Sequence, residues 1–261
     1  MSTGPDPRPP LDGSRLPASV EVEGEVASTN AVVAERARAG GPDGLVVVAE
    51  HQTAGRGRLD RTWQAPAGTA LTFSMLLRPD LPAARWPWIP LWTGYAVHTV
   101  LAPRLPGLGL KWPNDVLVES RKLAGILLER VETPTGPAAV VGVGLNVAQT
   151  RDELPVPEAT SLALELGGAG GAPDRTELLA ALVGSLTEHR PLLTRPADLR
   201  RAYADVCRTV GSAVRVELPG GGTLTGRAVD VDADGGLVVE GPTGREAVRA
   251  GDVVHVRAAD L

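Results

Sequence analysis

Residues 45–63 read LVVVAEHQTAGRGRLDRTW, an apolar run that leads directly into a charged loop with two glycines. The run LVVVAE (45–50) is continuous and rich in β-branched residues, which is typical of a strand buried on both faces of a sheet. TALTFSMLL (69–77) has the same character. Strands of this kind predict a sheet that is covered by helices.

Helical patterns alternate with further strand candidates on both sides of these two runs. Residues 86–105 carry apolar side chains at helical spacing between prolines, which predicts a helix packed on the sheet. Asp174 and Glu177 form a capping-box pattern in front of another helix. Further helices are expected from Ser28 or Thr29 to Gly40 and after Pro196, and further strands at 19–26, 110–112, 115–119, 123–131 and 138–147.

The chain changes character near residue 210. From there, five short alternating runs are separated by the turn sequences PGGG, DADGG and GPTG. Short strands at such close spacing predict a small antiparallel β-barrel. We therefore expect an α+β protein with a disordered tail at 1–19, a domain at 20–209 built on a mixed sheet flanked by helices, and a C-terminal barrel at 210–261.

Composition narrows the class of protein. The chain has 261 residues, 43% of them apolar and 22% charged, with a net charge of −5. This acidic balance argues against a protein that coats nucleic acid. The single cysteine, Cys207, excludes an internal disulfide; its place in PADLRRAYADVC predicts a buried thiol in a helix, and without a Cys/His cluster a zinc site is not expected. No secretory signal or membrane-spanning run is found, which predicts a cytoplasmic protein.

The loop QTAGRGR places two glycines among arginines. Gly55 and Gly57 lack a β-carbon, so their backbone can approach a ligand closely and direct amide hydrogens at an anion. Arg56 and Arg58 carry guanidinium groups that match phosphate or carboxylate geometry, and Arg61 follows further along. The alternative is a solvated basic loop or a weak nucleic-acid patch, and charge alone favours that alternative.

Two further segments, KWPND (111–115) and RKLAGIL (121–127), contain the only two lysines among the 26 arginine and lysine residues. A chain so rich in arginine would use arginine for ordinary surface charge, so Lys111 and Lys122 suggest a need for a compact ammonium group. In KWPND, Pro113 fixes a turn that presents Asn114 and Asp115, a pair suited to hydrated Mg²⁺. The alternative for KWPND is an Asx-type turn with its tryptophan in the core.

The segment VVGVGLNV is an apolar strand interrupted by Gly142 and Gly144, and such glycines often mark the close approach of a ligand. A dinucleotide-binding fingerprint fails because position 147 is valine, and a Walker A motif is absent. Any nucleotide must therefore be bound in another way.

Five segments in this order resemble the signature of the biotin–protein ligases: STN (28–30), HQTAGRGRLDRTW (51–63), KWPND (111–115), RKLAGIL (121–127) and GVGLN (142–146). The resemblance implies a class II aminoacyl-tRNA synthetase-like catalytic domain at 20–209, with the small C-terminal barrel. It also implies ATP-dependent attachment of biotin to a lysine of a biotin carboxyl carrier protein, through biotinyl-5′-AMP.

The resemblance assigns roles residue by residue. It implies catalytic roles for Lys111, Lys122 and Arg58, and a Mg²⁺ ion at Asp115. Biotin would be bound by Ser28, Thr29, Asn30, Gln52, Gly55, Arg56, Gly57, Arg58, Lys122 and Gly125. ATP would be bound by Arg56, Arg58, Arg61, Trp63, Lys111, Asn114, Lys122 and Asn146.

Two departures from the family pattern matter. Family loops often have glycine where this chain has Asp60, and pairing of Asp60 with Arg61 would alter loop closure. Only about 25 residues precede STN, too few for a winged helix-turn-helix, so the resemblance implies the ligase-only type. The expected partner is a carboxyl carrier protein, with no DNA and no membrane, and the expected state is a monomer or weak homodimer.

Three alternatives remain. A lipoate–protein ligase or octanoyl transferase of the same fold is the nearest, and KWPND together with GRGR favours biotin over it. A biotin-sensing DNA-binding repressor is disfavoured by the short N-terminal segment and the net charge. An inactive biotin-binding or scaffold module is the third, and the placement of both lysines within motifs speaks against it.

Overall fold

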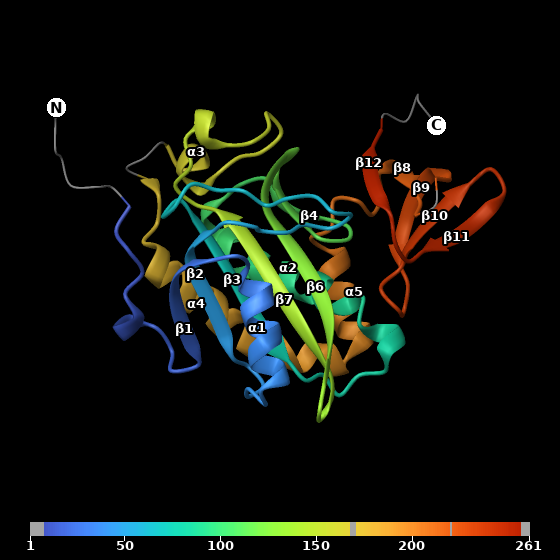
Figure 1. The fold of residues 1–261 in the computed structure, drawn as a ribbon. Coiled ribbons are helices and arrows are strands. Elements are labelled where there is room, and N and C mark those ends of the chain that lie inside the picture. The colour runs from blue at the N-terminus through green and yellow to red at the C-terminus, as the bar shows by residue number, and fades with distance from the viewer. Residues whose placement is uncertain (1–7, 168–170, 220, 257–261) are drawn as a thin grey trace.

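The computed structural model describes residues 8–167, 171–219 and 221–256, and it places them in two sheets with helices on the larger one (Figure 1). The strand candidates before residue 150 all form strands of the larger sheet. These are β1 (Val20–Val26), β2 (Val46–Gln52), β3 (Ala70–Leu77), β4 (Leu108–Lys111), β5 (Asp115–Val118), β6 (Arg121–Thr133) and β7 (Gly136–Asn146).

The large sheet is mixed, as the sequence predicted. Its strand order is β1-β2-β3-β7-β6-β5-β4. β1 and β2 run parallel, because the helix between them returns the chain to the same edge, and the other neighbouring strands are antiparallel. β3 lies inside the sheet and is buried on both faces, which explains why its sequence is apolar apart from Thr72 and Ser74.

Helices cover both faces of this sheet (Figure 1). One face carries α1, and the other carries α2 and α4. The helices are α1 (Thr29–Arg38), α2 (Trp88–Leu101), α3 (Leu162–Glu165), α4 (Arg175–His189) and α5 (Pro196–Ala204). Asp174 caps α4 as expected, accepting hydrogen bonds from the backbone N–H groups of Thr176 and Glu177. Within the described residues, no helix has the length and apolar character needed to cross a membrane.

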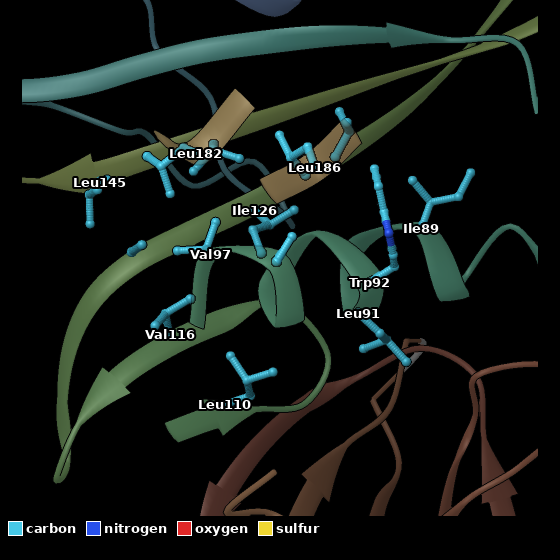
Figure 2. Close-up of a cluster of buried hydrophobic side chains, with 14 of the residues drawn as sticks. Ile89, Leu91, Trp92, Val97, Leu110, Val116, Ile126, Leu145, Leu182 and Leu186 are labelled. Atoms are coloured by element: carbon cyan, nitrogen blue, oxygen red, sulfur yellow. The ribbon is translucent and has the colours of Figure 1, made fainter. Parts of the chain in front are cut away.

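The main core lies between the sheet and the α2–α4 layer. Figure 2 shows Ile126 and Leu145 from the strands beside Val97 of α2, with Leu182 of α4 close by. Burial of each such side chain contributes roughly 1.5–3 kcal/mol. Trp92 of α2 is also buried there, and its indole N–H donates to the carbonyl of His189, 2.9 Å away.

The face of the sheet that carries α1 is apolar along part of its strands and is lined by small or polar residues further along. Under the body of α1 it presents Leu76, Val140 and Val131, which pack against Val33 and other apolar side chains of the helix. Beyond the helix N-terminus the next cross-strand rows contain serine, threonine and glycine instead. One row pairs Ser74 with Gly142 and Leu127, and the following row pairs Thr72 with Gly144, Gly125 and Asp115. The loss of bulky side chains in these rows leaves space above the sheet.

The C-terminal strands form a small antiparallel sheet, as expected, but in the described residues their pairing does not close it into a barrel. The sheet has the order β11-β10-β9-β8-β12 and is antiparallel throughout. In the described residues β11 and β12 are its two edges and do not pair with each other. Its strands are β8 (Ala213–Glu217), β9 (Thr223–Val231), β10 (Leu237–Gly241), β11 (Gly244–Val248) and β12 (Asp252–His255).

The second sheet shares its apolar core with the larger domain. Val214, Val231 and Leu237 belong to the same buried cluster as α2. The indole N–H groups of Trp88 and Trp112 donate to the carbonyls of Ala233 and Gly235, each at 2.9 Å. The turn DADGG between β9 and β10 is therefore fixed against α2 and against the segment between β4 and β5.

Two expectations about local order need correction. Residues 8–19 of the expected disordered tail are packed on the body, while residues 1–7 lie outside the described part. This packing arises because Leu11 N–H donates to the Glu50 carboxylate and Asp12 N–H donates to the Thr176 hydroxyl. Cys207 is buried as expected, but α5 ends at Ala204, so the cysteine lies beyond the helix, beside β4.

The ion pair that secures the N-terminal segment gives a first prediction. Arg175 Nη2 lies 2.7 Å from a Glu50 carboxylate oxygen, and the arginine side chain is only 5% exposed. Glu50→Ala should lower the free energy of unfolding by about 3 kcal/mol, because it leaves a buried guanidinium without its charge partner. Urea unfolding measures this loss. Glu132→Ala, which breaks an exposed pair with Arg130, is the control, and an equally small effect of both changes would contradict the prediction.

Candidate functional site

A pocket lies where the sheet face loses its bulky side chains. Its walls come from the N-terminus of α1, the loop 55–63, the β4–β5 turn and one residue of the second sheet, Asp252. Thirteen of the predicted site residues line it: Ser28, Thr29, Asn30, Gln52, Arg56, Gly57, Arg58, Arg61, Trp63, Asn114, Asp115, Lys122 and Gly125.

One end of the pocket is a buried hydrogen-bond network. Thr29 and Asn30 begin α1 and are less than 5% exposed. The Gln52 carbonyl oxygen accepts from the backbone N–H of Thr29 at 2.7 Å and lies 3.0 Å from its hydroxyl. Ser74 Oγ lies 2.7 Å from the Thr29 hydroxyl and 2.6 Å from Asn30 Oδ1. Ser74 was not among the predicted site residues, and its signal was a pair of hydroxyl residues, Thr72 and Ser74, at alternate positions of an otherwise apolar strand.

This network contains more acceptors than protons. Three oxygen–oxygen contacts join Thr29, Ser74, Gln52 and Asn30, and only the two hydroxyl groups have hydrogens to place in them. One contact therefore always lacks a proton. A ligand that brings N–H donors to this end would find acceptor oxygens ready for it.

The middle of the pocket is apolar and has a glycine floor. The Trp63 ring lies against Gly144, and a β-carbon at that position would collide with the ring. A β-carbon on Gly142 would likewise collide with Asn30 Oδ1. These two glycines of β7 therefore admit the tryptophan and the asparagine, and Leu127, which pairs with Gly142, completes the apolar section.

The loop over the pocket is a small hairpin. Trp63 N–H donates to the Gly55 carbonyl at 2.9 Å, and Gly57 N–H to the Arg61 carbonyl at 2.6 Å. At its tip, Leu59 and Asp60 have φ angles of 53° and 57°, in the left-handed region that favours glycine. Asp60 thus occupies a position that glycine adopts without strain, which is the physical meaning of the departure from the family pattern.

The other end of the pocket is cationic. Lys122 Nζ lies 2.6 Å from Asp115 Oδ1. Arg58 Nη1 donates to Asn114 Oδ1 at 3.2 Å, and the Asn114 amide donates in turn to the Ile126 carbonyl at 2.9 Å. Burial lowers the pKa of the Arg58 guanidinium, against the opposing attraction of Asp115 and Asp252. An arginine still keeps its charge under all ordinary conditions, so this end presents two cations around one carboxylate.

The second sheet reaches the loop through two contacts. Arg58 Nη2 donates to the carbonyl of Gly251 at 3.4 Å, and Arg61 forms an ion pair with Asp252. The hydrogen bond to Asp252 raises the pKa of Arg61. The expected pairing of Asp60 with Arg61 is not found among the described ion pairs, because the guanidinium turns toward the second sheet instead.

Three predicted site residues do not line the pocket. Gly55 lies at the base of the loop, where a β-carbon would collide with the carbonyl oxygen of Trp63. Asn146 is buried, donating to the Thr160 carbonyl and accepting from Gln149, each at 2.9 Å. Lys111 lies beside the pocket near His255, whose pKa is lowered by burial and by the charge of this lysine. Gly55 and Asn146 thus support the site from behind.

The arrangement suits one kind of ligand. Hydrogen-bonding groups, an apolar section and a cationic section follow one another across the pocket, because Gly142, Gly144, Gly125 and Asp115 lie in successive positions of the paired strands. A molecule with a polar head, an apolar body and an anionic end would match all three. Among the described residues no group of three or more acidic, histidine or cysteine side chains could hold a metal by itself.

Comparisons with known proteins agree with this geometry. Residues 24–146 match the model of the biotin/lipoate A/B protein ligase family, and residues 209–256 match that of the biotin protein ligase C terminal domain. A biotin--[acetyl-CoA-carboxylase] ligase of Mycobacterium tuberculosis is 43% identical, over 96% of this chain and 97% of the relative. The bifunctional ligase/repressor BirA of Bacillus subtilis is 30% identical, over 87% of this chain and 71% of its own.

A solved structure shares the architecture. Biotin protein ligase from Aquifex aeolicus in complex with biotin and ATP superimposes with a TM-score of 0.77 at 28% identity, covering 92% of this chain and 99% of the other. This likeness extends over both sheets of the chain.

The contact between the loop and the second sheet generates a prediction. Asp252→Asn removes the charge that pairs with Arg61 while keeping the side-chain shape, so the loop should open more often. We expect backbone amide hydrogen exchange of residues 56–61 to quicken by about fivefold, the upper range for an exposed ion pair. Asp234→Asn breaks the pair with Arg249 on the same sheet and serves as the control. Equal exchange rates in both variants would argue against a link between sheet and loop.

Proposed function

Because this chain belongs to the biotin/lipoate A/B protein ligase family, we propose that it attaches biotin to a lysine of a biotin carboxyl carrier protein at the expense of ATP. The observation that carries the proposal is the order of the three pocket sections. Biotin has a ureido head, an apolar ring and chain, and a carboxylate at its end, in that order. The relative with 43% identity is named for the same reaction.

The head of biotin would meet the acceptor-rich end. Its ureido ring offers two N–H donors and one carbonyl acceptor. The oxygens of Thr29 and Asn30, which lack protons for all their contacts, receive the N–H groups, and the Ser28 and Gln52 side chains lie beside them. Burial strengthens these hydrogen bonds and raises the cost of leaving them unmade.

The first chemical step brings two anions together. An oxygen of the biotin carboxylate attacks the α-phosphorus of ATP, the bond from that phosphorus to the bridging oxygen breaks, and pyrophosphate leaves with the electron pair. Lys122 and Arg58, which flank this end, offset the repulsion between carboxylate and phosphate and hold the reactants in line. Arg56 and Arg61 lie on the same loop, but their charges are paired with Glu129 and Asp252.

Mg²⁺ fits the groups present at the cationic end. A magnesium ion commonly uses one or two protein carboxylates and completes its shell with water and substrate phosphates. Asp115, with Asn114 beside it, supplies the carboxylate, and Lys122 is its present charge partner. When bound, the ion neutralises charge on the triphosphate. The role of Asp115 would be to hold the ion at the cationic end of the pocket.

The second step transfers the biotinyl group. The amine of the acceptor lysine attacks the carbonyl carbon of the mixed anhydride, the bond to the phosphate oxygen breaks, and AMP leaves. Until the acceptor arrives, water must be excluded from this anhydride. The loop 55–63 covers it, and the exposed Arg61–Asp252 pair is weak enough to release the loop when the carrier docks.

A lipoate-type substrate fits less well. Its dithiolane ring has no N–H donors, so the one contact among Thr29, Ser74, Gln52 and Asn30 that lacks a proton would stay without it. A buried polar group without a hydrogen bond costs about 1–3 kcal/mol, and biotin, which brings N–H donors, avoids this cost. The polar end of the pocket therefore favours biotin over lipoate.

One experiment tests the function directly. The protein is incubated with biotin, magnesium ATP and a biotin carboxyl carrier domain, and the intact mass of the carrier is measured. We expect a single biotinyl addition, and none in a parallel reaction with lipoic acid. A carrier that gains lipoyl but no biotinyl mass would refute the proposal.

The position of Lys122 generates a prediction about the first step. Lys122→Ala should reduce adenylate synthesis by at least about a thousandfold, because the one lysine among the described residues that line the pocket is lost from the end where charge stabilisation dominates. Pyrophosphate release in a single turnover measures this step. A normal burst of pyrophosphate would exclude Lys122 from adenylate formation.

A separate prediction concerns Arg58 and retention of the intermediate. Arg58→Ala should release biotinyl-5′-AMP about tenfold to a hundredfold faster, because a buried charge-assisted hydrogen bond to the phosphate is lost. The intermediate is formed in the protein and its escape is followed by rapid gel filtration. Arg245→Ala, in an exposed pair at the edge of the second sheet, is the control, and equal retention in both variants would contradict the role.

A further inference from the structure

Glu129 is a carboxylate in a row of the sheet that is otherwise apolar. On the α1 face, Leu76, Val140 and Glu129 occupy neighbouring positions across β3, β7 and β6. Leu76 and Val140 are fully buried there, in the cluster under α1. A charged group at such a position is costly unless it is paired and hydrogen-bonded. The Glu129 side chain is only 29% exposed, so water hydrates its charge in part and the charge needs partners within the protein.

The carboxylate of Glu129 has two partners from different parts of the pocket. Asn30 Nδ2 donates to its Oε2 at 2.7 Å, from the N-terminus of α1. Arg56 Nη2 lies 3.0 Å from its Oε1 and 3.1 Å from its Oε2, from the loop 55–63. One side chain thus touches both the residue at the polar end and the residue on the loop.

The contact with Asn30 fixes the orientation of an amide. The two ends of an asparagine amide have nearly the same shape, and hydrogen-bond partners decide which end points where. An ionised carboxylate only accepts, so it holds Nδ2 toward itself and directs Oδ1 toward Ser74 and Gly142. Among the described residues, this carboxylate is the acceptor that holds the amino group on that side.

The contact with Arg56 depends on the position of the loop. The arginine side chain is 54% exposed, so its ion pair is a weak and reversible one. When the loop is closed, the guanidinium completes the hydrogen bonding of the carboxylate, and when the loop moves away the carboxylate keeps only Asn30.

We propose that Glu129 is a positioning residue that couples closure of the loop 55–63 to the orientation of Asn30 in the head-group end of the pocket. The inference rests on the proposed function, since biotin is the ligand whose head lies against Asn30. Occupancy of the head-group end stabilises the oriented amide and its carboxylate partner, which favours the closed loop. Loop closure then favours a bound head group by the same amount.

Glu129→Gln tests the coupling. A glutamine carries no charge and has an NH₂ group in place of one carboxylate oxygen, so it loses the ion pair with Arg56 and no longer requires the Asn30 amino group on its side. We expect biotin to bind about tenfold more weakly and biotinyl-5′-AMP to leave about tenfold faster, the effect of one hydrogen bond to a charged group. Calorimetry with biotin and gel filtration of the formed intermediate measure the two quantities. Glu132→Gln, three residues along the same strand in an exposed pair with Arg130, is the control and should change neither.

Background variants separate positioning from a general structural effect. In an Arg56→Gln protein, Glu129→Gln should not accelerate release of the intermediate further, and in an Asn30→Ala protein it should not weaken biotin binding further. Glu129→Leu extends the apolar row, so it should preserve urea stability while weakening biotin binding. The inference would be overturned if Glu129→Gln had its full effect in both backgrounds, or if the Glu129→Leu protein bound biotin as tightly as the unsubstituted protein. Failure of the unsubstituted protein to bind biotin would instead refute the proposed function.

Discussion

One face of the large sheet has to satisfy two opposing demands, and the site depends on how it does so. Under α1 the face must be apolar and filled, because the helix buries its own apolar side chains there. Beyond the helix N-terminus it must be empty. The change occurs within one strand repeat, from Val140 to Gly142 on β7 and from Leu76 to Ser74 on β3. Because successive side chains alternate between faces, the opposite face keeps its branched residues and the main core is undisturbed.

Charge is distributed across the pocket in a way that suits two anions. Arg58 and Lys122 surround Asp115 at the cationic end. Toward the polar end, the carboxylate of Glu129 neutralises the charge of Arg56. The cations at the reactive end are thus only partly neutralised before a ligand arrives. That imbalance is unfavourable in the empty protein and becomes favourable when carboxylate and phosphate bind, which is the general form of electrostatic preorganisation.

The second sheet belongs to the site as well as to the fold. Trp112 precedes the turn that carries Asn114 and Asp115, and its indole is held by the carbonyl of Gly235. The backbone N–H of Trp112 also donates to Thr209, just before the second sheet. Movement of that sheet would therefore disturb both the turn beneath the pocket and the loop above it, where Asp252 holds Arg61.

The sequence by itself determined the succession of strands and helices along the chain, the mixed sheet and most of the residues that line the pocket. Periodicity and glycine placement are local properties, and the motifs follow the chain closely enough to be read from it. Only the tertiary structure decided that the C-terminal strands form an open sheet, that Arg61 turns to Asp252 and that Asn146 supports the pocket from behind. It also brought Ser74 and Glu129 into contact with residues that line the pocket. These outcomes depend on which residues face each other across strands, and that register is fixed by packing between segments far apart in the chain.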